Sequence, residues 1–164
     1  MLLFTLLIAA APAAHAALPP CRPAQLRLSA ENADGRFDGM SHSGTELTIR
    51  NIGRACALPA LPRVEMHDRR GRLAAVREPA TGRHRGRAIA PFRLAAGHRA
   101  AIDLRWVSGP VFERNRSVAA ETVSVRIGTG AIRASLGATL FGPAGAPVTF
   151  DQNPAAVPED APAG

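Results

Sequence analysis

Residues Arg50–Val64 have the sequence RNIGRACALPALPRV, and the order of residue types in this segment indicates how the chain folds. An alternating apolar and polar run ends in Asn-Ile-Gly, a cysteine follows, and prolines stand at positions 59 and 62. A proline cannot donate a hydrogen bond to a strand ladder. We therefore expect a strand end, a turn at Gly53, an anchor at Cys56 and a link outside the ladder until a strand begins at Arg63.

Alternation with a period of two residues recurs along the rest of the chain. It is typical of half-buried β-strands, because successive side chains point to opposite faces. The expected strands are Gln25–Ser29, Thr45–Ile52, Arg63–Asp68, Ala101–Trp106 and Thr122–Ile127, with weaker candidates at Ile132–Leu136 and Val148–Phe150. Glycine-containing turn signals separate these runs, and Gly128-Thr129-Gly130 predicts a hairpin. The pattern predicts an all-β fold, an antiparallel β-sandwich of about seven to nine strands.

The N-terminal residues predict export. Leu2–Ala11 is an apolar run too short to span a bilayer, and Ala14-His15-Ala16 has the A-x-A pattern of a secretory cleavage site. We expect a signal peptide at 1–16, cleaved after Ala16, and a periplasmic or secreted protein with no transmembrane segment after cleavage. Lipidation of Cys21 is an alternative, although Pro20 stands where a lipoprotein signal has a small, flexible residue.

The mature chain has the length of one domain. We expect a monomer with a single β-sandwich domain over 17–150, including a long polar loop at Arg77–Ala88. Residues 151–164, rich in proline, alanine and acidic residues, are expected to form a disordered tail. Two cysteines in an exported chain predict one disulfide, Cys21–Cys56.

The order of these features resembles a known family, the exported bacterial domain of unknown function 4232. The resemblance is carried by Cys21–Leu28, Leu47–Gly53, Cys56–Val64, Asp68–Gly71, Phe92–Gly97 and Ala100–Trp106. It implies an immunoglobulin-like sandwich with the Cys21–Cys56 bridge, and it implies no activity, cofactor or catalytic residue. The chain departs from the family pattern at Ala96-Gly97, where Pro-Gly is usual. It also lacks a second cysteine pair in its C-terminal half.

Charge suggests a class of partner. The formal net charge is +7, and all basic residues are arginine, which is consistent with a GC-rich genome. In an exported protein, this charge favours envelope polyanions over nucleic acid. Two loops concentrate it and are candidate anion-binding sites, although solvated turns are the favoured interpretation of both. Their arginines are Arg69, Arg70 and Arg72 in the first loop, and Arg83, Arg85 and Arg87 in the second.

A metal site is a second possibility. Met40 and His42 are close in the chain, and thioether and imidazole ligands in an oxidising compartment suit copper. His67 could contribute, although it follows Met66 on a strand and therefore points to the opposite face. We expect Val64 and Met66 to point inward and His67 outward. No cofactor is otherwise indicated.

Catalysis is not indicated. The segment Gly39–Gly44 has the sequence GMSHSG, which is not the G-x-S-x-G of a nucleophile elbow. Trp106 is expected in the core, packed against the disulfide. We expect a non-enzymatic, exported domain that binds or scaffolds an envelope protein or polyanion. The alternatives are a periplasmic copper-binding protein and an electrostatic binder that uses the arginine loops.

Overall fold

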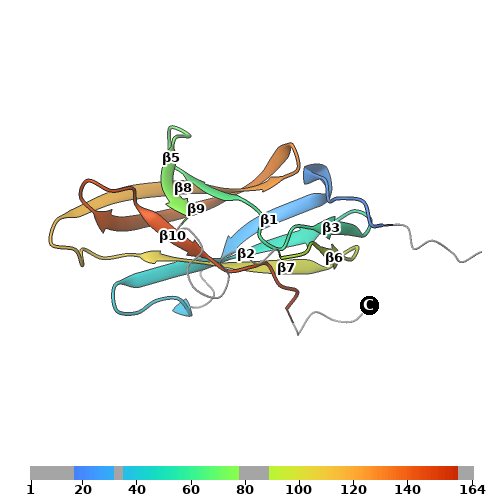
Figure 1. Cartoon of the computed structure of the whole chain (residues 1–164), viewed down its shortest axis with the longest axis horizontal. Coiled ribbons are helices and arrows are strands. Elements are labelled where there is room, and N and C mark those ends of the chain that lie inside the picture. The colour runs from blue at the N-terminus through green and yellow to red at the C-terminus, as the bar shows by residue number, and fades with distance from the viewer. Residues whose placement is uncertain (1–16, 32–34, 78–88, 159–164) are drawn as a thin grey trace, which may run out of the picture.

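The structure, a computed structural model, describes residues 17–31, 35–77 and 89–158. These residues form strands, one short 3-10 turn and no α-helix (Figure 1). The elements are η1 (Pro23–Gln25), β1 (Leu26–Glu31), β2 (His42–Asn51), β3 (Cys56–Leu58), β4 (Val64–His67), β5 (Leu73–Arg77), β6 (Phe92–Leu94), β7 (Arg99–Val107), β8 (Asn115–Ile127), β9 (Gly130–Pro143) and β10 (Thr149–Gln152). The predicted all-β fold class is confirmed.

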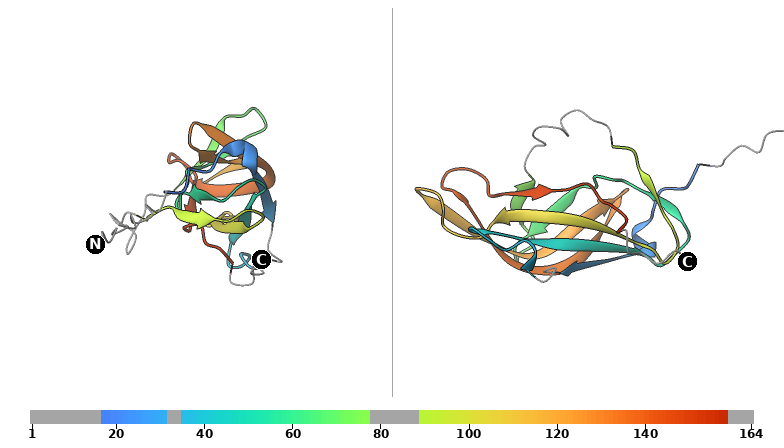
Figure 2. Two further views of the ribbon diagram at one scale, coloured as in Figure 1. Left: turned by 90° about the vertical axis from the view of Figure 1, so that its right-hand side faces the viewer. Right: turned by 90° about the horizontal axis from the view of Figure 1, so that it is seen from below.

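Eight of the strands form one sheet in the order β1-β2-β7-β10-β5-β4-β8-β9, and β3 pairs with β6 in a small second sheet. All pairings between strands are antiparallel except β10 with β5, which is parallel. The end strands β1 and β9 contact each other, so the large sheet curls into a nearly closed, barrel-like shape (Figure 2). Because of this curl, the predicted sandwich is not confirmed.

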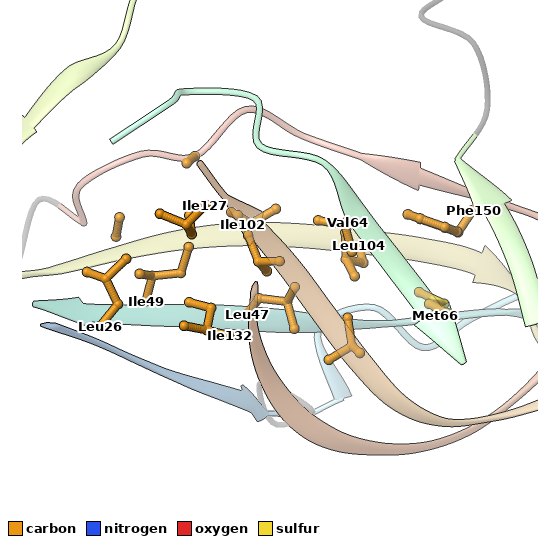
Figure 3. Close-up of a cluster of buried hydrophobic side chains, with 14 of the residues drawn as sticks. Leu26, Leu47, Ile49, Val64, Met66, Ile102, Leu104, Ile127, Ile132 and Phe150 are labelled. Atoms are coloured by element: carbon orange, nitrogen blue, oxygen red, sulfur yellow. The ribbon is translucent and has the colours of Figure 1, made fainter. Parts of the chain in front are cut away.

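The core follows from the alternation in the sequence. On β7 the alternate residues Ala100, Ile102, Leu104 and Trp106 are buried, and their neighbours on the strand are more exposed. On β4, Val64 and Met66 point inward and His67 points outward, as expected. Figure 3 shows these apolar side chains filling the interior, with Leu26 and Ile49 toward one end and Met66 and Phe150 toward the other. Alternation therefore predicted which strand faces are buried.

The Cys21–Cys56 disulfide is confirmed, and both cysteines are buried. Next to it lies Asn51, the last residue of β2, whose side chain is fully buried. Its Nδ2 donates to the carbonyls of Arg54 at 2.9 Å and Leu94 at 3.1 Å, and its Oδ1 accepts from the backbone N–H of Gly53 at 2.9 Å. One polar side chain thereby joins the end of β2 to the turn and to β6.

Two expectations about this segment need correction. The link after the turn is not wholly irregular, because Cys56–Leu58 forms β3 and pairs with β6. Trp106 is in the core, but it does not pack against the disulfide. It lies opposite Ser43 near the start of β2, about eight residues or about 26 Å along that strand from Asn51 and the bridge. Aliphatic side chains such as Leu26 and Leu94 occupy the core at the disulfide end.

The structure continues the domain past the boundary expected at Phe150. Strand β10 extends to Gln152, and beyond it the backbone of Ala156 exchanges hydrogen bonds with Ala101 at 2.8 and 3.0 Å. Ala155 is buried, with 8% of its surface exposed, and it donates to the carbonyl of Ala60. The physical reason is that β7 offers backbone groups on the edge opposite β2, and residues 151–156 satisfy them. The rest of the expected tail, from residue 159, lies outside the described residues.

The hairpin at Gly128-Thr129-Gly130 is confirmed: Ile127 pairs with Gly130, and Gly128 has a φ of 57°. Strands β8 and β9 are longer than predicted, because they continue as a two-stranded arm that alternates only weakly in sequence. Within the described part of the chain, no helix is long and apolar enough to cross a membrane.

Candidate anion-binding groove

The turn that joins β4 to β5, residues Asp68–Arg72, is built around the Asp68 side chain. Its Oδ1 accepts from the backbone N–H groups of Arg70 and Arg72, each at 2.9 Å. Its Oδ2 accepts from the Arg72 guanidinium, with Nε at 2.9 Å and Nη2 at 2.8 Å. Gly71 takes a φ of 75°, a left-handed conformation that favours glycine. The sequence DRRGR thus folds as a turn held by its own first residue.

These contacts change the acidity of Asp68. The backbone hydrogen bond from Arg72 is the largest effect that lowers the pKa of Asp68, followed by the Arg72 side chain and the Arg70 N–H. Partial desolvation opposes the shift but does not reverse it. Asp68 therefore carries its negative charge and holds Arg72 at neutral pH. One of the three arginines predicted in this loop is consequently engaged within the turn.

The other two arginines of this turn, Arg69 and Arg70, are not held by Asp68 through their side chains. The side chains of Arg69 and Arg70 are exposed and, among the residues that the structure describes, make no hydrogen bond or ion pair. In Figure 1 the turn projects above the body of the molecule, next to β5. These two guanidinium groups are therefore accessible to an anionic partner.

An open groove of about 670 Å³ lies beneath this turn. The N-terminal half of β8, which extends past the end of β4, supplies its other side. The lining residues are Asp68, Arg69, Arg70, Arg72, Leu73, Ala74, Arg116, Ser117, Val118, Ala119 and Glu121. We call this the arginine groove. Four arginines against two carboxylates give it an excess of positive charge.

Arg116 is the member of this groove that the sequence did not suggest. It lies on β8, 46 residues after Arg70, and its only described side-chain contact is a long hydrogen bond of 3.4 Å to the Ala146 carbonyl. Nothing in the local sequence around Arg116 links it to the turn at Asp68. The arrangement of β8 beside β4 and β5 brings it there.

The second predicted loop, with Arg83, Arg85 and Arg87, falls in residues 78–88, outside the described part of the chain. The first loop alone defines the groove described here.

The proposed metal ligands are not assembled into one site. Met40 and Ser41 form the tip of a tight hairpin, and the Met40 side chain is 97% exposed. His42 directs its Nδ1 to the Met40 carbonyl at 3.1 Å. His67 ends β4 and lies 3.9 Å from a Glu65 carboxylate oxygen. In the sheet order, β7, β10 and β5 separate the strands of His42 and His67.

The described residues also contain no group of three or more His, Cys, Asp or Glu side chains placed to hold a metal ion. In chemical terms, the arginine groove can bind anions by charge and by hydrogen bonds from guanidinium and serine hydroxyl groups.

Comparison with known proteins adds one match. A family model described as "Domain of unknown function (DUF4232)" matches residues 21–157, which begins at the first cysteine and ends beyond β10. No curated protein and no solved structure matches the chain.

Proposed function

Since the chain belongs to the family of the domain of unknown function DUF4232, and that family has no assigned activity, we propose a function from the chemistry of this chain alone. The protein is an exported, non-enzymatic domain of the bacterial cell envelope. It binds an anionic envelope polymer, such as a phosphorylated glycan, in the arginine groove.

The observation that carries this proposal is the convergence of Arg69, Arg70 and Arg116 on one groove. All three side chains are exposed, and none of them forms an ion pair with a described residue. Unpaired arginines around a concave surface create a positive potential that attracts polyanions. Asp68 contributes by holding the turn in place, since it occupies Arg72 and leaves the other arginines directed outward.

Export and the immunoglobulin-like fold belong to the same proposal. The buried disulfide is compatible with an oxidising compartment. Without β10, which pairs over two residues with β7 and over two with β5, two layers remain: β1-β2-β7 and β5-β4-β8-β9. Immunoglobulin domains place their first, second, fifth and fourth strands in one sheet and their third, sixth and seventh in the other. Strands β1, β2 and β7 match the first, second and fifth, and β4, β8 and β9 match the third, sixth and seventh, whereas β6 pairs with β3 and does not take the place of the fourth strand.

The copper alternative has less support. It needs Met40, His42 and His67 in one ligand set, and three strands of the sheet separate the last of these from the other two. Metal analysis of the protein purified from the periplasm, with a Met40→Ala/His42→Ala variant as control, addresses this alternative directly.

A binding experiment with lipopolysaccharide tests the groove. We expect the triple variant Arg69→Gln/Arg70→Gln/Arg116→Gln to bind at least about tenfold more weakly at low salt and to lose most of its salt dependence. The matched control is Arg93→Gln/Arg126→Gln/Arg133→Gln. It removes the same charge from three exposed arginines that likewise form no ion pair with a described residue.

Equal weakening by both triple variants would show that net charge, not the groove, governs binding. Binding unaffected by either variant would also overturn the proposal. Determination of the mature N-terminus tests export separately, and Ala17 is the expected first residue.

A further inference from the structure

A second basic feature lies on a different surface, at the ends of β1, β2 and β7 nearest to β3 and β6 (Figure 1). Strand register places Arg27 of β1 directly opposite Arg50 of β2, and Arg50 directly opposite Arg99 of β7. All three residues are exposed. Three arginines thus form one row across three adjacent strands, which we call the arginine row.

Such a row is unfavourable by itself, because like charges in directly opposed positions of neighbouring strands destabilise a sheet. The repulsion between arginines should be strongest at Arg50, the central residue of the row. Arg50 has an arginine opposite it on both sides, and it makes no side-chain hydrogen bond or ion pair with any described residue. Arg27 directs its Nη1 to the carbonyls of Leu26 and Ala24, at 3.0 and 3.4 Å, and not to a carboxylate.

Two acidic residues on the same face of the sheet, unlike Arg50, have an oppositely charged side chain beside them. Four residues farther along the strands, the register aligns Glu31 with Glu46 and Glu46 with Asp103, which form an acidic row. Here a counter-charge is present: the Arg36 guanidinium lies 2.9 Å from Glu46 and 2.8 Å from Asp103. Arg36 thus pairs with two of the three acidic residues and the row keeps a net negative charge, whereas Arg50 has no acidic partner among the described residues.

The arginine row lines an open groove of about 680 Å³. Two residues farther along the strands, Ser29 and Thr48 stand opposite each other and add two hydroxyl groups to the groove. The Ala96–Arg99 turn forms one wall of the groove. None of its lining residues belongs to the arginine groove. The two basic surfaces are therefore distinct sites.

We propose that the arginine row binds a compact ligand that carries two or more phosphate groups. A guanidinium group pairs with phosphate through two parallel hydrogen bonds, and hydroxyl groups complete the contacts to the remaining oxygens. Neighbouring strands are about 4.8 Å apart, so the row spans about 10 Å, which is more than one phosphate can bridge. The acidic row, about 13 Å away along the strands, repels any polyanion that extends toward it. The site is thus suited to a short oligophosphate or to a lipid headgroup with two phosphates.

Titration with inorganic tripolyphosphate, followed by calorimetry on the intact mature protein, tests the site. We expect Arg50→Gln to weaken tripolyphosphate binding about tenfold or more. The control Arg126→Gln removes one exposed arginine from β8 and should change binding by less than about twofold, as should the groove variant Arg69→Gln/Arg70→Gln/Arg116→Gln. Arg50→Lys keeps the charge without the paired donors and should give an intermediate affinity.

Thermal unfolding provides a second readout that does not depend on calorimetry. Tripolyphosphate should raise the Tm of the wild-type protein and of Arg126→Gln, and it should raise the Tm of Arg50→Gln much less. Sedimentation with phosphatidylcholine vesicles that contain cardiolipin, a lipid with two phosphates, then distinguishes the sources. Vesicle binding that depends on Arg50 identifies a lipid headgroup, and tripolyphosphate binding alone identifies a soluble ligand.

The proposal is overturned if Arg50→Gln and Arg126→Gln weaken tripolyphosphate binding equally, since that would show a general charge effect. It is also overturned if neither probe binds the wild-type protein, or if only the arginine-groove variant loses binding. The last outcome would leave the proposed function intact, and loss of lipopolysaccharide binding in the groove variant is independent of Arg50. The two proposals can therefore fail separately.

Discussion

At the scale of single residues, Asn51 shows how one polar side chain can determine the geometry around it. It occupies a core-facing position at the end of β2, next to the apolar positions Leu47 and Ile49. A buried amide is costly unless it is hydrogen-bonded, and Asn51 forms hydrogen bonds to the turn, to β6 and to η1. A polar residue that continues the inward-facing set of an alternating strand therefore marks a structural junction.

We expect Asn51→Ala to lower the free energy of unfolding by about 2–4 kcal/mol, because the buried Leu94 carbonyl and the partly buried Gly53 N–H would lose their hydrogen bonds to this side chain. Urea denaturation measures the change. The control is Asn115→Ala. The Asn115 side chain also bonds two backbone groups, both on Phe112, but it is exposed, so water can replace it. A cost for Asn51→Ala no larger than for Asn115→Ala would contradict this role.

Asp68 gives a prediction about pH. The pKa of Asp68 in the folded state lies below the ordinary value of an aspartate, mainly because the carboxylate accepts hydrogen bonds from Arg72 and Arg70. A depressed carboxyl pKa means that its contribution to stability is present above the unfolded pKa and is lost as the pH falls through the folded pKa. We expect the Arg70 and Arg72 amide resonances to shift together in an NMR titration, with a midpoint below the ordinary pKa of an aspartate. In Asp68→Asn, the same amides should show no such transition.

At the scale of elements, the hairpin tip before β2 runs against local preference. Gly39 and His42 exchange backbone hydrogen bonds at 3.1 and 2.9 Å, so Met40 and Ser41 are the two central residues of a tight turn. Both have positive φ, 44° and 65°, as in a type I′ turn, for which Asn-Gly is preferred. Neither methionine nor serine favours that conformation.

We therefore expect Met40→Asn/Ser41→Gly to stabilise the protein by about 1–2 kcal/mol, since each change removes strain at a left-handed position. The midpoint of thermal or chemical unfolding measures the gain. As a control, Glu113→Asn/Arg114→Gly places Asn-Gly at two exposed residues without positive φ and should give no comparable gain. An unchanged or lower midpoint for the hairpin variant would show that the tip is not strained.

At the scale of the whole molecule, the disulfide fastens the start of the chain to the small sheet. Cys21 donates to the Ala57 carbonyl at 3.0 Å, and Ala57 donates to the Pro19 carbonyl at 2.8 Å, so the bridge continues into backbone hydrogen bonds. The sequence separation between the cysteines is 35, and the loop they close contains β1 and β2. The bridge therefore restricts the unfolded state of about a quarter of the described fold.

Removal of the bridge in Cys21→Ala/Cys56→Ala should cost about 3–4 kcal/mol of unfolding free energy, as expected for a closed loop of this length. Denaturation of the variant and of the wild-type protein, each with and without reductant, measures it. Reductant should bring the wild-type midpoint down to that of the variant and should leave the variant unchanged. Two thiols that react with a labelling reagent in protein taken directly from the periplasm would contradict an oxidised bridge.

Much of the strand pattern was predictable because alternation is a local property of each segment. The inward faces of β2, β4 and β7 follow directly from it, as do the β8–β9 hairpin and the pairing of the only two cysteines. The short strands β3, β5 and β6 escaped prediction, because three to five residues carry too little alternation to stand out. Residues 151–156 also escaped, because their order comes from the β7 edge and not from their own composition.

The sequence by itself determined which side chains face inward, which cysteines pair and where the charge concentrates in one turn. Only the tertiary structure decided which charges become neighbours. Arg116 reaches the groove of Arg69 and Arg70 because β8 extends past β4, and the arginine row depends on the register of β1, β2 and β7. The physical reason is that side-chain direction is set within a strand, whereas register is set between strands distant in sequence. A shift of one residue would turn every arginine of a strand to the other face.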